Sequence, residues 1–315
     1  MSLSQTVHKP LVAVAVVSTL SFFPATGLAK DDFGQKIEDT LAKTAVKATG
    51  MKKVLEPGLC TPQPAGYRTS TQLPEDQLAV PKGLTLEYVT REAGNATDLM
   101  VLWPSDNPTH LLTAVEGGRQ DLGGGKFNPS VQRINLATGA VETILRGLTS
   151  VDPIRTTPWG TILVGEETTS GGAYEILDPL NVTNQTVTDR ATGANTDPTH
   201  IVKRTALPGI AWEGNVILEN GIMYFGDELR PGTGTANADG GSIFKFVPTT
   251  LWAGGPPITD LANSPFAAGN VYAARVSCTT GTQYGQGCEV GNLEWVSVSA
   301  ATARTDAHAA GATGY

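Results

Sequence analysis

The sequence predicts an all-β fold, and three observations support this prediction. From about Leu84 onward, short runs of Val, Ile, Leu and Thr alternate with clusters of Gly, Pro, Asn and Asp, a pattern typical of many short strands. Asn220-Gly221 separates two apolar runs and is a strong hairpin signal. Apolar runs that end in an acidic residue recur about 50 and about 60 residues apart, a spacing typical of the four-stranded blades of a β-propeller.

The first 29 residues precede this region and indicate an export signal. A short polar head ends at Lys9, an apolar run extends from Leu11 to Phe23, and Gly27-Leu28-Ala29 offers the small residues that a signal peptidase needs. The run is too short to cross a bilayer comfortably, although an uncleaved anchor is the alternative. Since no twin arginine precedes it, we expect general secretion to a periplasmic or extracellular location.

Residues 30–83 are the second predicted part of the chain. Apolar residues recur every four positions from Phe33 to Ala45, which favours a surface helix. Five prolines between Glu56 and Pro81 indicate an extended connector. The predicted organisation is a signal peptide at 1–29, a helical and Pro-rich leader at 30–83, and propeller blades at 84–315.

The strands of the β-rich region are predicted in two sets. No stretch after the signal is long and apolar enough to span a membrane. The first set comprises Leu99–Trp103, Leu111–Val115, Val131–Leu136 and Val141–Leu145. The second set comprises Thr161–Gly165, Ala173–Leu177, Asn215–Leu218, Ile222–Phe225 and Ser242–Val247.

Charge and cysteine content restrict the class of function. The formal net charge is −8 at pH 7, which argues against nucleic-acid binding and suits a protein that binds cations. Cys278 and Cys288 flank a Gly-rich loop and could pair as a disulfide in an oxidising compartment, or both remain thiols; Cys60 then has no partner. The sequence lacks a Cys-x-x-Cys pair, so a zinc ribbon is not expected.

Three predicted strands end in acidic residues: Glu116, the pair Glu166-Glu167 and the pair Asp227-Glu228. Equivalent strands of successive propeller blades surround one axis, so these acids should meet at one mouth of the channel. Carboxylates that approach one another are costly unless a cation lies among them, and Ca²⁺ binds six to eight oxygens. The alternative is that each acid is a solvated turn residue.

Two further side chains belong to this prediction. Glu213, in Trp212-Glu213-Gly214, precedes a strand and is either another ligand or a capping residue. Arg230 lies three residues after Asp227 and is the best placed arginine to grip a phosphate, although a surface ion pair is the alternative. Strand alternation requires that only one of Glu166 and Glu167 points inward, and the sequence does not say which.

The segments around these acids resemble the PhoX-type alkaline phosphatases and their relatives once catalogued as domain of unknown function 839. The resemblance extends from about Leu84 to the C-terminus, and its best pieces are Leu112–Glu116, Trp159–Thr168, Ile222–Glu228 and Gly241–Val247. It implies a six-bladed type of propeller whose central acids hold calcium and, in the phosphatases, iron. These metals polarise a phosphate monoester. Carried over by residue, Glu116, Glu166 and Glu213 are metal ligands, and Asp227 is a fourth.

The chain departs from this family in three respects. The sequence has no cysteine between Cys60 and Cys278, where the phosphatases carry an iron-binding cysteine, so Fe³⁺ is not expected while Ca²⁺ is. Ile210-Ala211-Trp212 lacks the basic residue expected before Glu213. The sequence stops at Tyr315 where family members continue, so we expect a C-terminally truncated member with an incomplete ring.

Three functions remain open at this stage. The first is a calcium-dependent phosphoric monoester hydrolase acting on a small phosphate ester, with no catalytic residue assigned. The second is a non-catalytic, calcium-stabilised propeller that binds a partner or polymer at the cell surface. The third is a propeller lactonase, which nothing in the sequence selects over the others. The sequence does not indicate an oligomeric state.

Overall fold

The computed structural model describes residues 33–49, 73–74, 85–235, 238–278 and 291–312. Its internal contacts divide the chain into two units, 1–88 and 89–315. The first unit contains α2 (Phe33–Thr49), which spans the region where apolar spacing predicts a helix. The expected signal peptide, the Pro-rich segment before Pro81 and the Cys278–Cys288 pairing lie wholly or partly outside the described residues. Within the described part, no helix has the length and apolar character needed to span a membrane.

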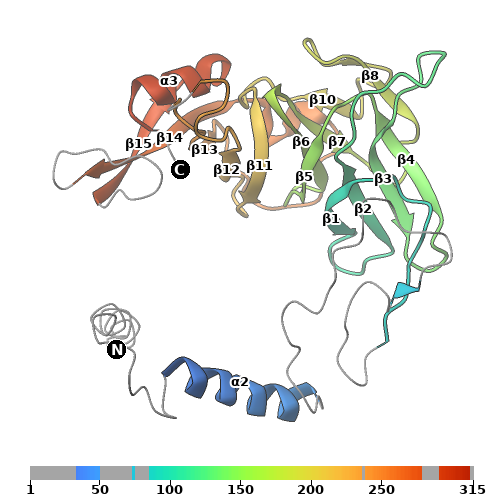
Figure 1. Cartoon of the computed structure of the whole chain (residues 1–315). Coiled ribbons are helices and arrows are strands. Elements are labelled where there is room, and N and C mark those ends of the chain that lie inside the picture. The colour runs from blue at the N-terminus through green and yellow to red at the C-terminus, as the bar shows by residue number, and fades with distance from the viewer. Residues whose placement is uncertain (1–32, 50–72, 75–84, 236–237, 279–290, 313–315) are drawn as a thin grey trace. The chain divides into compact units, whose positions relative to one another are not determined.

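The second unit is built from antiparallel hairpins that follow one another along the chain (Figure 1). Blade 1 is the four-stranded meander at the start of this unit, extended by two short strands, of which β8 runs parallel to β4. Its strands are β1 (Thr97–Trp103), β2 (His110–Val115), β3 (Pro129–Asn135) and β4 (Val141–Arg146), followed at the edge by β8 (Gln185–Asp189) and β9 (Ala194–Asn195).

Blades 2 and 3 are two meanders joined in one sheet. The long strand β6 joins them, because its first part pairs with β5 and β7 while its end pairs with β11. Blade 2 comprises β5 (Val151–Thr156), β6 (Thr161–Gly171), β7 (Ala173–Leu177) and β10 (Ile201–Lys203). Blade 3 comprises β11 (Ile210–Ile217), β12 (Met223–Asp227), β13 (Ile243–Pro248), β14 (Gly269–Cys278) and β15 (Gly291–Val298).

Short helices complete the second unit. Two of them, η3 and η4, lie between β13 and β14 and are capped by the side chains of Asp260 and Ser264. The other two follow β15. Their bounds are η3 (Leu261–Asn263), η4 (Pro265–Ala267), η5 (Ala300–Thr302) and α3 (Ala303–Ala309).

The all-β prediction is confirmed: the second unit consists of successive antiparallel meanders, and the sheets do not close into a ring within the described residues. The predicted second set of strands is divided between two blades, because β11 begins a new meander. The sequence analysis missed β5, in which Asp152 and Pro153 interrupt the apolar pattern. It also missed β14 and β15.

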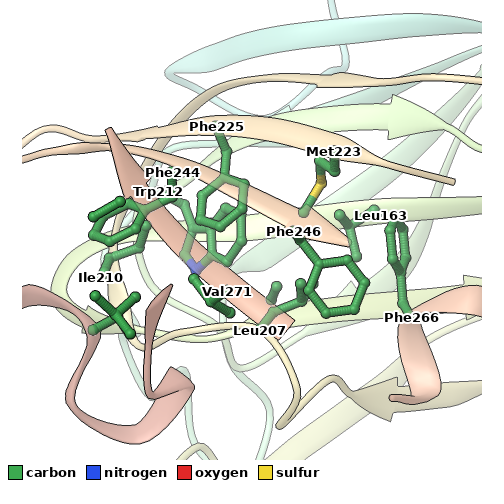
Figure 2. Packing of buried hydrophobic residues seen from close by; sticks show 14 of the residues in the cluster. Leu163, Leu207, Ile210, Trp212, Met223, Phe225, Phe244, Phe246, Phe266 and Val271 are labelled. Atoms are coloured by element: carbon green, nitrogen blue, oxygen red, sulfur yellow. The ribbon is translucent and has the colours of Figure 1, made fainter. Parts of the chain in front are cut away.

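Hydrophobic clusters pack between neighbouring blades. One cluster joins blade 1 to blade 2 and includes Leu112, Ile154 and Val164. The other joins blade 2 to blade 3 and is rich in aromatic rings (Figure 2). In it, the ring centroids of Trp212 and Phe225 lie 4.6 Å apart in a stacked arrangement. Burial of these rings helps to hold blade 3 against blade 2.

The approach of β11 to β6 depends on a glycine. A Cβ atom at Gly165 would lie 2.6 Å from Cβ of Trp212 and 3.0 Å from Cγ of Pro153. Any larger side chain would therefore separate the strands that carry the acidic residues described below.

A buried carboxylate ties blade 2 to the short helices. Glu175 is fully buried and its oxygens accept hydrogen bonds from Trp159 Nε1 at 2.7 Å, Thr161 Oγ1 at 2.5 Å and Ser264 Oγ at 2.7 Å. Arg204 Nε pairs with the same carboxylate at 2.6 Å. Since its charge is balanced and both oxygens have donors, this group stabilises the fold, and its partners described here include none of the strand-end acids.

Candidate metal centre

The first two strands of each blade form a hairpin with the same irregularity. At one end of each hairpin, a single residue pair is followed by a register shift. The next pair lies three residues further along the first strand but only two residues back along the second strand. The three equivalent pairs are Thr97–Val115, Val151–Glu166 and Trp212–Asp227. The described blades therefore contain a structural repeat at the strand ends.

An acidic residue directly follows both members of each pair. Because the strands are antiparallel, the acid near the start of the first strand and the acid at the end of the second lie at the same end of the hairpin. The three couples are Asp98 with Glu116 in blade 1, Asp152 with Glu167 in blade 2, and Glu213 with Glu228 in blade 3.

Backbone hydrogen bonds join these strand ends across the blades. Ser150 N donates to Gly117 O at 2.9 Å, and Ser150 O accepts from Glu167 N at 2.6 Å. Ala211 pairs with Glu167 across the β6–β11 contact, and its carbonyl accepts from Glu228 N at 2.9 Å. The acid-bearing ends of the three blades are thus fixed relative to one another.

Three of the acids converge closely. One carboxylate oxygen from each of Asp152, Glu167 and Glu213 lies within 4.8 Å of the others. Asp152 is buried, and the other two are partly buried. Two oxygens bound to one Ca²⁺ at about 2.4 Å can be separated by up to about 4.8 Å, so this spacing allows one cation to contact all three.

Two members of the triad, Asp152 and Glu167, have raised pKa values. Burial is the main cause that raises the pKa of Asp152 to about 8, and the hydrogen bond and charge of Glu213 and the charge of Asp98 add to it. The pKa of Glu167 is also raised to about 8, first by its hydrogen bond to Glu228, then by burial and by the charges of Glu228 and Glu116. Asp152 and Glu167 therefore retain protons near neutral pH.

The hydrogen bond with Glu167 also lowers the pKa of Glu228, and Arg230 adds to this effect. Arg230 Nη2 pairs with Glu228 Oε1 at 2.5 Å and is itself largely exposed. Arg230, which the sequence suggests as a phosphate-binding residue, thus lies at the edge of the acidic cluster and contacts one of its members.

The structure brings only some of the predicted ligands into this cluster. Glu213 belongs to the triad, and Glu116 is an exposed neighbour of Glu167. Glu166 is instead buried, where Arg190 Nε contacts its Oε1 at 2.6 Å. Asp227 is also buried, and its two oxygens accept from Arg304 Nη2 and Nε, each at 2.6 Å. In both acidic pairs, the first acid faces an arginine and the second faces the cluster.

Sequence reasoning missed Asp98 and Asp152, and the family resemblance assigned Glu166 as a ligand where the structure places Glu167 in the cluster. The signal that could have found the two aspartates is the repetition of an acid near the start of each first strand, in Thr97-Asp98, Val151-Asp152 and Trp212-Glu213. The repeat is hidden in the sequence because the residues around these acids differ from one blade to the next.

Comparisons with known proteins add one finding. No protein-family model matches the chain, and no curated protein sequence matches it. Among solved structures, the chain is similar to Pseudomonas fluorescens PhoX in complex with vanadate, a transition state analogue, with a TM-score of 0.45 and 16% sequence identity. The match covers 70% of this chain and 55% of that chain, so this chain spans little more than half the length of that PhoX.

Proposed function

We propose that this chain is an exported, PhoX-like metal-binding protein that holds Ca²⁺ at Asp152, Glu167 and Glu213. The observation that carries the proposal is the convergence of three carboxylate oxygens within 4.8 Å from three strands in two blades. Carboxylates brought this close without a cation repel one another, and a divalent cation converts that repulsion into attraction.

The chemistry of the donors suits calcium. All three triad residues offer oxygen, the ligand atom that Ca²⁺ prefers. Glu116, Glu228 and Asp98 lie close enough to perturb the triad, and they could add oxygens toward the six to eight that calcium needs. The sequence has no cysteine between Cys60 and Cys278, so the thiolate expected for iron has no counterpart. We therefore propose calcium and not iron.

A bound cation would supply Lewis-acid chemistry toward a phosphate monoester by polarising a phosphoryl oxygen. The chain's own contribution would be to orient that oxygen at the cluster. Arg230 is the nearest candidate to contact the phosphate, because it lies beside Glu228 and is exposed. A small phosphate ester is accordingly the proposed substrate class.

A second function is supported by the same arginine. Arg230 is already paired with Glu228, so it is not free to bind phosphate unless that ion pair opens. This pairing favours a non-catalytic propeller in which calcium stabilises the fold and the protein binds a partner or polymer at the cell surface.

Calcium titration of the full chain by calorimetry tests the metal proposal. We expect Glu167→Gln and Asp152→Asn each to weaken binding at least about tenfold, as removal of one charged ligand from a small set should do. Glu219→Gln is the matched control, because Glu219 is an exposed acid in the β11–β12 turn. A wild-type chain that binds no calcium, or variants that bind as tightly as wild type, would refute the proposal.

Hydrolysis of p-nitrophenyl phosphate separates the two functions. Activity that requires calcium and falls in Glu167→Gln supports the phosphatase. Calcium binding with no hydrolysis by the wild-type chain removes the phosphatase and leaves the calcium-stabilised binding protein.

A further inference from the structure

Two buried carboxylates occupy equivalent positions next to the acidic cluster. Glu166 and Asp227 are the second-strand members of the register pairs in blades 2 and 3, and each directly precedes a cluster acid. Their side chains are almost completely buried, with 1% and 0% exposure. In blade 1 the same position is held by Val115, which is also buried.

Glu166 fixes the strands that carry two members of the triad. Its Oε1 accepts from Thr149 N at 3.0 Å, three residues before Asp152, and from Arg190 Nε at 2.6 Å. Its Oε2 accepts from Gly172 N at 3.0 Å, at the β6–β7 turn. The carboxylate thereby connects the approach to β5 with β6, in which the next residue is Glu167.

Asp227 has the same role between β11 and β12. Its Oδ1 accepts from Ala211 N at 3.1 Å, two residues before Glu213, and the next residue after Asp227 is Glu228. Arg304, from α3, holds both oxygens of Asp227 and also donates from Nη1 to Thr169 O in β6 at 2.8 Å. One arginine thus connects α3, β6 and β12, and through Asp227 also β11.

We propose that Arg304 and Arg190 are positioning residues for the metal centre. Arg304 holds Asp227 and Arg190 holds Glu166, and each of these acids directly precedes a cluster acid in the chain. This inference rests on the proposed function. Neither arginine contacts the triad in the hydrogen bonds described above. Groups that orient metal ligands typically change metal affinity by 10–100-fold when they are removed, and these two ion pairs fix all three strands that supply the triad.

A positioning role and a purely electrostatic role of Arg304 predict opposite changes in cation affinity when this arginine is replaced. If Arg304 acts only through its charge, Arg304→Met makes the cluster more negative, and cation binding becomes tighter. If Arg304 positions the strands, the same variant loosens β6, β11 and β12, and binding becomes weaker. Asp227→Asn weakens binding in either case, so the pair of variants must be read together.

The test is a titration of the full chain with Tb³⁺, a luminescent substitute for calcium, read by Kd and not by activity. We expect Arg304→Met and Asp227→Asn each to raise the Kd about 10-fold or more. The double variant should be little worse than either single variant, since both remove the same contact. Under a charge-only role the double variant would return to the wild-type Kd. Arg190→Met with Glu166→Gln repeats the cycle at the second pair.

Arg204→Met is the control for a general loss of stability. This substitution breaks the buried pair between Arg204 and Glu175, which touches none of the strand-end acids in the contacts described. It should lower the melting temperature of the metal-free protein while leaving the Tb³⁺ Kd unchanged. Arg304→Lys, which keeps a cation near Asp227, should recover part of the affinity.

Three results decide the matter. Weaker binding in Arg304→Met, with Arg204→Met at the wild-type Kd, supports the inference. An Arg304→Met variant that is folded and binds Tb³⁺ as tightly as wild type, or more tightly, overturns it while the proposed function stands. A wild-type chain that binds no Tb³⁺ overturns the proposed function and the inference together.

Discussion

Glu166 and Glu167 are neighbours in β6, yet their carboxylates have opposite environments. Glu166 is buried against Arg190 and two backbone amides, whereas Glu167 lies among Asp152, Glu213 and Glu228. Alternation along a strand sends consecutive side chains to opposite faces, so two chemically identical residues have different roles. One holds the strand in place, and the other can bind a cation.

We predict that substitution of these two glutamates changes the stability of the metal-free protein in opposite directions. Glu166→Gln removes the charge that pairs with Arg190 and should lower the free energy of unfolding by about 1.5–3 kcal/mol, the range for hydrogen bonds to charged groups. At neutral pH the carboxyl of Glu167 must take up a proton when the chain folds, so Glu167→Gln removes this cost and should stabilise the metal-free protein. Urea unfolding in excess chelator measures both.

When calcium is added, the order of these two variants in free energy of unfolding should reverse. Glu166→Gln should still gain stability from the metal, while Glu167→Gln should gain little. If both variants lose stability without metal, the carboxyl of Glu167 stabilises the metal-free fold and does not lie in a repulsive cluster.

The strand pattern could be predicted from the sequence, because it follows from local periodicity, but of the four predicted ligands only Glu213 belongs to the triad. Apolar runs that end in Glu116, Glu166-Glu167 and Asp227-Glu228 are visible without a structure. The choice between adjacent acids was not predictable, because it depends on a one-residue register shift that no local signal marks.

Long-range partners were also beyond local reasoning. Arg304 lies 77 residues after Asp227, and Arg190 reaches Glu166 from a loop that follows β8. Asp152 was missed because a proline such as Pro153 is not expected in a central strand. Within the described residues β5 pairs only with β6, as an edge strand does, and so it tolerates the proline.

We predict that Gly165→Ala loosens the contact between β6 and β11. The added Cβ would meet Trp212 and Pro153 at or below 3.0 Å, which is closer than such atoms approach, and overpacking of this kind costs about 1–3 kcal/mol. Thermal unfolding of the metal-free protein measures the loss. The matched control is Gly214→Ala, since nothing lies within 4 Å of a Cβ at Gly214. Equal melting temperatures in the two variants would contradict the close packing at Gly165.

We predict that calcium raises the melting temperature of the wild-type chain by mass action on the folded state. At a free concentration of about 100 times the Kd, binding to the folded state alone adds about 2.7 kcal/mol to the free energy of unfolding. Differential scanning calorimetry over a series of calcium concentrations measures the shift. Magnesium at equal concentration is the control, because its preference for near-ideal octahedral coordination suits a cluster of carboxylates less well. A transition that is identical in calcium and in chelator would count against the metal centre.

The stability of the metal-free protein should fall as the pH rises from about 4.5 to about 8. The pKa values of Asp152 and Glu167 lie at about 8 in the folded chain, against ordinary values of 3.8 and 4.5, so the folded state binds more protons than the unfolded state throughout this interval. The free energy of unfolding therefore decreases with increasing pH, and the stabilisation present below the ordinary values is lost as the folded groups ionise. Glu228, whose pKa is lowered, contributes in the opposite sense only below its ordinary value of 4.5 and does not mask the trend.

Calcium should remove most of this pH dependence, because the bound cation replaces the protons that the crowded acids retain. Urea unfolding at pH 5, 6, 7 and 8, with chelator and with saturating calcium, gives the two slopes directly. Asp152→Asn should flatten the slope in chelator, whereas Glu219→Gln, at an exposed acid outside the cluster, should leave it unchanged. A slope in chelator that is flat or rises with pH would mean that Asp152 and Glu167 ionise normally, and that the strand ends hold their carboxylates further apart than the structure has them.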